Sequence, residues 1–191
     1  ITNFNERHNG RLFYNTGKRI NNGLVRLGHS VLEFSDRDIL SNHRKLNDFN
    51  GSKYLNKKLL LVIGNYNPDL VILGHADLID IKTLKLIKEY YPNIKFSQWF
   101  LDKMDSNWTS NKKRFLDKLD IMDANFCTTD TSVLKFHKKK PIYYIPNPVD
   151  LSFEKLKNYE FKNLKNDVFF AMSHGVHRAI LKKGKFDMRE N

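Results

Sequence analysis

Short apolar runs along the chain predict β-strands. The run Leu70–Leu73 follows the turn Asn67-Pro68-Asp69 and stops at Gly74-His75. A continuous apolar run between turn residues indicates a strand that is buried on both faces. Similar patterns predict strands at residues 29–34, 94–100, 124–128 and 141–145, and residues 1–4 resemble the end of a strand whose beginning is missing.

The segments between these predicted strands show the spacing of apolar residues that is typical of helices. Apolar residues recur at helical spacing over residues 13–27, and Gly28 occupies the place of a glycine that closes a helix. Further helices are predicted over residues 55–66, 81–91, 115–119 and 131–138, whereas residues 37–50 show no clear pattern. Such alternation predicts an α/β, Rossmann-like, doubly wound parallel sheet with helices on each side.

The pattern also predicts a domain boundary. We expect the first Rossmann-like domain over residues 1–150, a charged linker over 151–166, and the start of a second Rossmann-like domain over 167–191. A strand at 168–172 followed by a small-residue turn and a helical pattern would open that second domain. The residues left cannot complete it, so we expect a fragment of a longer chain.

Composition narrows the class of protein. The chain has 191 residues, of which 40% are hydrophobic, enough for a sizeable core. The single cysteine, Cys127, excludes an intramolecular disulfide and indicates a reducing compartment. No apolar run reaches the ~20 residues of a membrane helix. We therefore expect a cytoplasmic protein, with the inner face of the membrane as an alternative location.

The net charge of +12 would attract nucleic acid, anionic lipid or phosphorylated substrates. The basic residues come in short groups beside acids, such as Lys112-Lys113-Arg114, and we interpret them as solvated helix faces. No zinc-finger spacing or RNA-binding aromatic signature is present, so no nucleic-acid partner is expected. A phosphate-rich or membrane-surface partner is the alternative.

Candidate functional residues follow the strands, because ligands of open parallel sheets bind outside the carboxyl ends of the strands. His75 can act as acid, base or hydrogen-bond donor near neutral pH, and Gly74 lets a ligand approach the backbone. The alternative is that His75 caps a helix or satisfies a buried carbonyl. The other candidates at these ends are Asn5, Gly10, Ser35, Asp36, Asp102, Asp105, Thr129, Asp130, Asn147 and Asp150.

Asp105, and Trp99 in the strand before it, also have ordinary alternatives. Asp102 and Asp105 could hold sugar hydroxyls or supply a general base, but Asp105 is also a good helix N-cap. Trp99 could stack on a sugar, although packing is the commoner role. In the second domain, His174, Gly175 and Arg178 lie where a strand gives way to a helix and form a plausible diphosphate cradle. Neither the dinucleotide fingerprint G-x-G-x-x-G nor the P-loop motif is present.

These residues together resemble a glycosyltransferase of the two-domain B fold, near the spore-maturation-protein-like branch of the broad group 1 class. The resemblance covers nearly the whole chain and rests on four segments. They are the loop Asn5–Gly10, "PDLVILGH" ending at His75, "YYIPNPVDLSFEK" at the close of the first domain, and "DVFFAMSHGVHR" at the opening of the second.

The resemblance implies a function. Residues 1–150 would bind the acceptor, and the second domain would bind a nucleoside-diphosphate sugar, with His174, Gly175 and Arg178 near its diphosphate. These three residues are offset from the family's usual pattern for such contacts. A bacterial cell-envelope hexosyltransferase would transfer sugar to a glycan or a lipid-linked hydroxyl, with no metal cofactor. His75 and Asp102 would be the catalytic candidates, and Asn5, Gly10, Gly74, Trp99 and Asp105 the substrate-binding ones.

Two other classes remain open. One is a non-enzymatic Rossmann-like ligand-binding module; a response-regulator-like version would need an acidic pair after the first strand, where this chain has Asn3 and Asn5. The other is a nucleotide-sugar epimerase on the same two-domain plan.

Overall fold

A computed structural model describes residues 1–104, 109–132, 140–163 and 165–166, and divides the chain into two compact units, residues 1–154 and 155–191. In the second unit, Asn158–Glu160 forms a 3-10 helix, η2. The predicted strand at 168–172 and the predicted diphosphate cradle (His174, Gly175, Arg178) lie outside the described residues, as does Asp105. The remaining description concerns the first unit.

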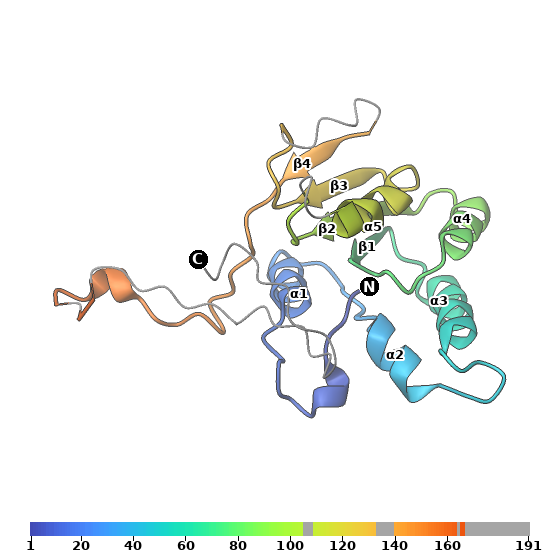
Figure 1. Ribbon diagram of the computed structural model, residues 1–191, viewed down its shortest axis with the longest axis horizontal. Helices are drawn as coiled ribbons and strands as arrows, with labels where there is room; N and C mark the ends of the chain where they lie inside the picture. The colour runs from blue at the N-terminus through green and yellow to red at the C-terminus, as the bar shows by residue number, and fades with distance from the viewer. Residues whose placement is uncertain (105–108, 133–139, 164, 167–191) are drawn as a thin grey trace. The chain divides into compact units, whose positions relative to one another are not determined.

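Four parallel strands form the sheet of this unit, in the order β1-β2-β3-β4 (Figure 1). The strands are β1 (Leu70–Gly74), β2 (Lys95–Phe100), β3 (Ala124–Cys127) and β4 (Ile142–Tyr144). The prediction of an α/β fold with a parallel sheet is confirmed. Gly74 at the end of β1 lies opposite Trp99 of β2, so the residues after both strands meet at one edge of the sheet.

The predicted helices at 13–27, 55–66, 81–91 and 115–119 are present, and α2 lies in the stretch that showed no clear pattern. The helices are η1 (Glu6–His8), α1 (Thr16–Arg26), α2 (Asp36–Asn42), α3 (Ser52–Tyr66), α4 (Ile81–Tyr90) and α5 (Thr109–Leu119). Most of the predicted helix at 131–138 lies outside the described residues. Among the helices that the structure describes, none has the length and apolar character needed to cross a membrane.

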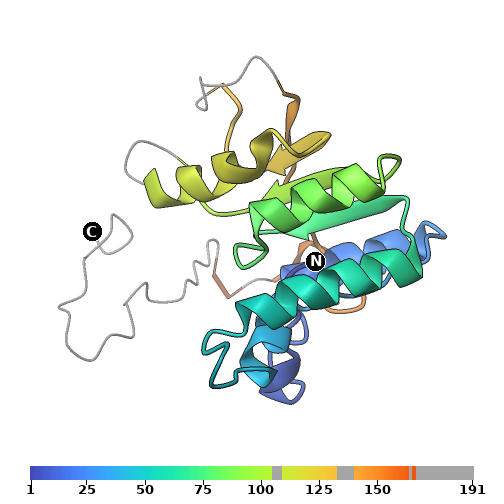
Figure 2. The ribbon, with the colours of Figure 1, turned by 90° about the vertical axis from the view of Figure 1, so that its right-hand side faces the viewer.

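The main core lies on one face of the sheet, which α3, α4 and α5 cover (Figure 2). Val71 and Leu73 alternate toward this face and pack against buried residues of α3 and α4, among them Leu59 and Leu84. A second cluster joins Phe115 and Leu119 of α5 to Phe100 and Cys127. Each such buried apolar side chain contributes roughly 1.5–3 kcal/mol. This packing holds α5 over the end of β2.

Helix α1 lies against the opposite face, close to the first residues of the chain. A Cβ atom on its Gly17 would lie 2.4 Å from the Cγ2 atom of Thr2, so only glycine permits this approach. The Asn15 side chain caps the helix by accepting the Lys18 N–H at 3.0 Å. At the far end Gly28 has φ 88°, as its predicted role in closing the helix requires.

The first residues extend the sheet beyond β1. The Ile1 amine donates to the Ile72 carbonyl at 2.7 Å, and the Gly74 N–H donates to the Ile1 carbonyl at 2.8 Å. On its other side Thr2 donates to the Phe34 carbonyl at 3.1 Å. From Ile1–Thr2 the chain first runs through α1 to Phe34 on one side, and later returns to β1 on the other side. The order of the strands reverses here, so Ile1–Thr2 and β1 form the topological switch point of the sheet.

The predicted strands at residues 1–4 and 29–34 are not regular strands. A single parallel bridge between Thr2 and Ser35 is all that pairs them, and a strand needs a continuous ladder of hydrogen bonds. Residues 29–34 alternate as a strand does, but the prediction of a regular strand there is wrong, because most of the segment has no neighbouring strand among the residues that the structure describes.

The end of the first unit is fastened to α1. The buried carboxylate of Asp150 accepts hydrogen bonds from Arg26 at 2.6 Å and from Asn22 at 2.8 Å. It also accepts the N–H and hydroxyl of Ser152. These contacts give Asp150 a structural role at the exit from the domain.

Candidate functional site

His75 lies at the carboxyl end of β1 in a strained backbone conformation. Its φ is 61° and that of Ala76 is 36°, both in the left-handed region that ordinary residues avoid. Such conformations cost about 1–3 kcal/mol each, persist only where the surroundings impose them, and cluster at functional sites. The strain turns the chain sharply out of the sheet immediately after the strand.

Gly74 and Trp99 together explain why the strand ends on glycine. A Cβ atom at Gly74 would lie 2.0 Å from the Trp99 Cζ2 atom, so the glycine makes room for the indole. Trp99 is 7% exposed. The close approach of Gly74 to the indole is a packing contact, and the role of both residues in substrate binding stays a prediction.

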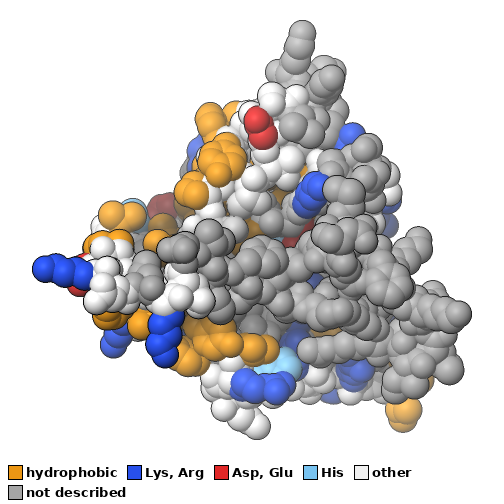
Figure 3. Space-filling view, turned by 60° about the vertical axis from the view of Figure 1, so that its left-hand side comes forward, with side chains coloured by type: hydrophobic (Ala, Val, Ile, Leu, Met, Phe, Trp, Pro, Cys, Tyr) orange, Lys and Arg blue, Asp and Glu red, His pale blue; other side chains and the backbone are white. Residues whose placement is uncertain are grey.

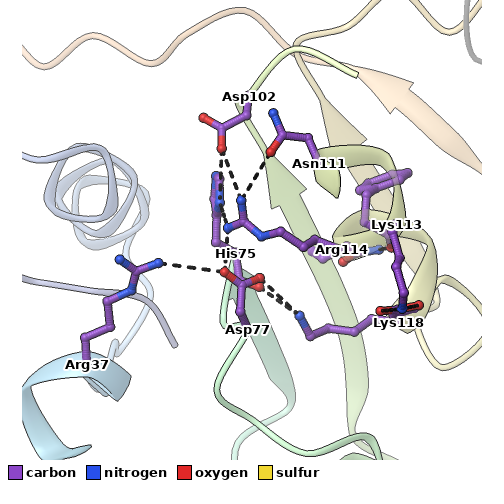
Figure 4. Close-up of polar contacts among 11 residues, drawn as sticks. Arg37, His75, Asp77, Asp102, Asn111, Lys113, Arg114 and Lys118 are labelled. Carbon is purple, nitrogen blue, oxygen red and sulfur yellow. Dashed lines mark hydrogen bonds and ion pairs between the residues drawn. The ribbon is translucent and has the colours of Figure 1, made fainter. Parts of the chain in front are cut away.

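The His75 ring contacts both an aromatic ring and a guanidinium group, and Figure 4 shows the second of these contacts, with Arg114. It stacks on Phe100 with the ring centroids 4.4 Å apart and an interplanar angle of 17°. Its Nδ1 atom lies 2.9 Å from Nη2 of Arg114. A guanidinium only donates hydrogen bonds, so Nδ1 must accept. The imidazole is therefore neutral, with its proton on Nε2.

Electrostatics favour the same neutral form. Burial lowers the pKa of His75 below its ordinary 6.5; Asp102 opposes this shift, and the Arg114 charge lowers the pKa further. The Asp102 carboxylate is 3.7 Å from His75 Nδ1 and 3.5 Å from Arg114 Nη1. With Nδ1 already accepting from Arg114, Asp102 pairs with the guanidinium rather than with a charged imidazole.

Asp77 is the centre of the charged network beside His75. It accepts a hydrogen bond from Arg114, and ion pairs join it to Arg37 at 3.7 Å and to Lys118 at 3.8 Å. Figure 4 shows these side chains converging on Asp77 from different elements, with Arg37 reaching across from α2. The carboxylate thus ties α2, the turn after β1 and α5 together.

Lys118 stabilises the strained turn by a hydrogen bond to its backbone. Its side chain is buried, with the residue 4% exposed, and its ammonium donates to the His75 carbonyl at 2.8 Å. Burial lowers the pKa of Lys118, and the nearby Asp77 charge opposes that shift. A buried ammonium needs such partners, and in return it fixes the orientation of the His75 backbone.

These basic residues were missed by sequence reasoning. The interpretation of Lys112-Lys113-Arg114 as a solvated helix face is wrong for Arg114, which belongs to the network. Arg114 and Lys118 are one helical turn apart beside the buried Phe115 and Leu119, and that spacing was the available signal. Three cations (Arg37, Arg114, Lys118) face two carboxylates (Asp77, Asp102), so the formal charge of the cluster is +1.

The loop after the first residues, which contains Asn5 and Gly10, is anchored separately. The Asp38 carboxylate accepts the N–H groups of Glu6 at 2.9 Å and Arg7 at 3.3 Å, and it also accepts the Ser35 hydroxyl. Burial alone would raise the pKa of Asp38, but these hydrogen bonds hold it below the ordinary value. Asp38 was not among the sequence candidates.

Asn5 and Gly10 have positive φ angles of 61° and 85°. No contact within the described part of the chain joins either residue to His75. Ser35 anchors the loop, and Asp36 is buried, which raises its pKa. The sequence therefore located the loop but not what holds it.

A cavity of about 420 Å³ adjoins the charged network, and Asp77 contributes to its wall. Its other lining residues include Leu40, Arg44, Asn50, Ser52 and Asp80. Among residues the structure describes, no group of histidine, cysteine and acidic side chains is arranged to hold a metal ion. On the face in Figure 3, lysine and arginine side chains of the described residues stand apart rather than forming one continuous basic surface.

Comparisons with known proteins add no relative: no family model, no curated protein and no solved structure matches the chain.

Proposed function

We propose that this chain contains the acceptor-binding half of a sugar transferase with the two-domain B fold. The observation that carries the proposal is the neutral His75, which lies at the carboxyl end of β1 beside the switch point of the sheet. Ligands of open parallel sheets bind at this place. The resemblance of the four sequence segments described above supplies the reaction class.

The proposed reaction transfers a sugar from a nucleoside diphosphate to a hydroxyl group of a glycan or lipid-linked acceptor. The acceptor oxygen bonds to the anomeric carbon, the bond from that carbon to the diphosphate breaks, and the hydroxyl proton leaves to a base. The formal charge of +1 in the cluster favours a ligand that carries phosphate. The proposal includes no metal ion.

The geometry divides the roles of His75 and Asp102. Because Arg114 occupies Nδ1, His75 is suited to donate from Nε2–H to a sugar or phosphate oxygen. Asp102 is half exposed, with its side chain 49% accessible, and is the better candidate for the base in an inverting reaction. If the reaction retains configuration, His75 would contact the donor sugar and no base at Asp102 is required.

A binding experiment on this chain tests the proposal. Ligand-observed NMR against glycans, phosphorylated sugars and nucleoside-diphosphate sugars should show weak binding that His75→Ala abolishes. The control is His43→Ala, because His43 also stacks on an aromatic ring, Tyr54, but lies outside the network. Binding that survives His75→Ala unchanged would overturn the assignment of the site.

Transfer activity separates the proposal from its alternatives. We expect the first unit by itself, residues 1–154, to turn over no sugar, because the proposal assigns the sugar donor to a second domain. Robust transfer by residues 1–154 would contradict the two-domain assignment. In a longer form of the protein that carries the donor domain, ligand binding without transfer would favour the non-enzymatic binding module, and epimerisation of the sugar nucleotide would favour the epimerase.

A further inference from the structure

A second cavity, of about 640 Å³, extends from the amino end of β1, at residues 67–70, to Phe4 and Trp99. Residues 29–32 form one wall and residues 67–72 the other. Side chains from α1 and α3 line it as well, including Ile20 and Leu24 of α1 and Leu59 of α3. The groove is therefore bounded by two stretches of backbone and by two helices that cover opposite faces of the sheet.

Both backbone walls offer unused hydrogen-bonding groups. The Lys95 N–H bonds to the Asp69 carbonyl, so the odd-numbered residues of β1 face β2, and the N–H groups of Leu70 and Ile72 point toward the groove. Opposite them, the Phe34 carbonyl accepts from Thr2, so in an extended chain the N–H groups of Leu32 and Phe34 point toward the groove, and neither makes a hydrogen bond to another residue that the structure describes. Backbone groups like these normally pair, and an exposed strand edge is a template for another strand.

Ile1 and Thr2 show how wide the groove is. Ile1 bonds to β1 on one side while Thr2 bonds to Phe34 on the other, so a single chain already bridges both walls at the closed end of the groove. Adjacent strands lie about 4.8 Å apart, so this spacing admits one strand between the walls. The groove continues the line of that strand.

We propose that the groove is the seat of an extended apolar segment joined to the nitrogen of Ile1 and running parallel to β1. The segment would pair with residues 31–34 on one side and with Leu70 and Ile72 on the other. Because helices cover both of its faces, it would be apolar at successive positions instead of alternating. Ile1 lies opposite Leu73 of β1. At ~3.3 Å per residue, about four residues ahead of Ile1 would therefore extend along β1 as far as Asp69.

The buried amine of Ile1 supports a covalently joined occupant over a separate one. Burial lowers the pKa of this amine to about 6, while Asp36 and Glu33 oppose the shift. A peptide N–H at the same place would donate the same hydrogen bond to Ile72 without placing a charge in the interior.

Two extended chains test the proposal. One carries Val-Ile-Val-Ile ahead of Ile1, and the matched control carries Gly-Ser-Gly-Ser. The apolar extension should raise the melting temperature by about 5–10 °C over the control, since each kcal/mol is worth about 2–4 °C at this chain length. It should also slow hydrogen exchange of the amides of Leu32 and Phe34 at least tenfold, whereas the control should not.

Equal melting temperatures and equal exchange rates for the two extensions would overturn the proposal. Sedimentation tests a second copy as the occupant. If residues 1–191 form a dimer that the apolar extension converts to a monomer, the groove accepts a second copy and the proposed occupant is wrong. A chain that stays monomeric in both forms, with the apolar extension protected, supports the proposal.

Discussion

The carboxyl end and the amino end of the sheet differ in which of their polar groups have hydrogen-bond partners. At the carboxyl end, charged side chains from α2, the turn after β1 and α5 satisfy one another around Asp77, and the backbone is strained at His75. At the amino end most of the lining side chains are apolar, and backbone N–H groups on both walls of the groove have no partner among the residues that the structure describes. The first arrangement is typical of a ligand site and the second of a place where another strand belongs.

The difference lies in what each end can bind. A pre-arranged set of donors and charges recognises polar ligands at little cost in reorganisation, because its side chains are already held by one another. An apolar groove with unpaired backbone groups on its walls binds an extended polypeptide through main-chain hydrogen bonds, which do not depend on polar side chains. The larger cavity is therefore not the better candidate for small-molecule binding here.

The largest expected effect comes from the junction of β1 with the site. Gly74→Ala should destabilise the fold by about 3 kcal/mol, because the new Cβ would overlap the Trp99 indole in a packed interior. The measurement is chemical denaturation. Gly23→Ala is the control: nothing lies within 4 Å of a Cβ there, so this substitution inside α1 should stabilise by about 0.5–1 kcal/mol. Equal effects of the two substitutions would contradict the packing described.

In a chain that begins at Ile1, without the extension proposed above, the amino end should show a pH dependence of its own. The pKa of the Ile1 amine is about 6 in the folded chain against 8.0 as its ordinary value. Between pH 6 and 8 the unfolded chain therefore binds more protons, so stability rises with pH over this window, by about 2–3 kcal/mol. Denaturation of the N-acetylated chain should lack this rise. A rise of the same size after acetylation would assign it to another group.

Removal of the Lys118 ammonium tests the support of the strained turn. Lys118→Met keeps the aliphatic stem but leaves the His75 carbonyl and Asp77 without this donor, and we expect a loss of about 2 kcal/mol. Lys113→Met is the control, since its pair with Asp117 is exposed and should contribute less than about 0.5 kcal/mol. Similar losses of stability in the two variants would contradict the stabilising role of Lys118 at the turn.

The smallest effect concerns the proton affinity of His75. Arg114→Met removes a charge that lowers the pKa of His75, so that pKa should rise. NMR titration of the imidazole signals measures it, with His43 as the internal reference. An unchanged or lower pKa of His75 in the variant would contradict the contact between Nδ1 and the guanidinium.

The sequence predicted much of the fold because its strands and longer helices carry strong periodic signals. It located His75 by the same logic, since Leu70–Leu73 ends there. It could not predict Arg114 or Lys118 as site residues, because their position depends on how α5 packs over Phe100. Nor could the alternation of residues 29–34 reveal that most of this segment has no partner strand.

Gly74 shows the limit in another way. From the sequence we explained the glycine before His75 by the close approach of a ligand to the backbone. In the structure the indole of Trp99, in the next strand along the chain, occupies the space that a side chain at residue 74 would need. Only the register of β1 against β2 brings the two residues together.

The tautomer of His75 tests the central claim most directly, because the proposed site depends on a neutral imidazole that donates from Nε2. A long-range proton–nitrogen NMR spectrum of the ¹⁵N-labelled chain at pH 7 distinguishes the three possible forms. The account predicts an unprotonated Nδ1 and a protonated Nε2 on His75. A protonated Nδ1, in either a neutral or a charged ring, would contradict it.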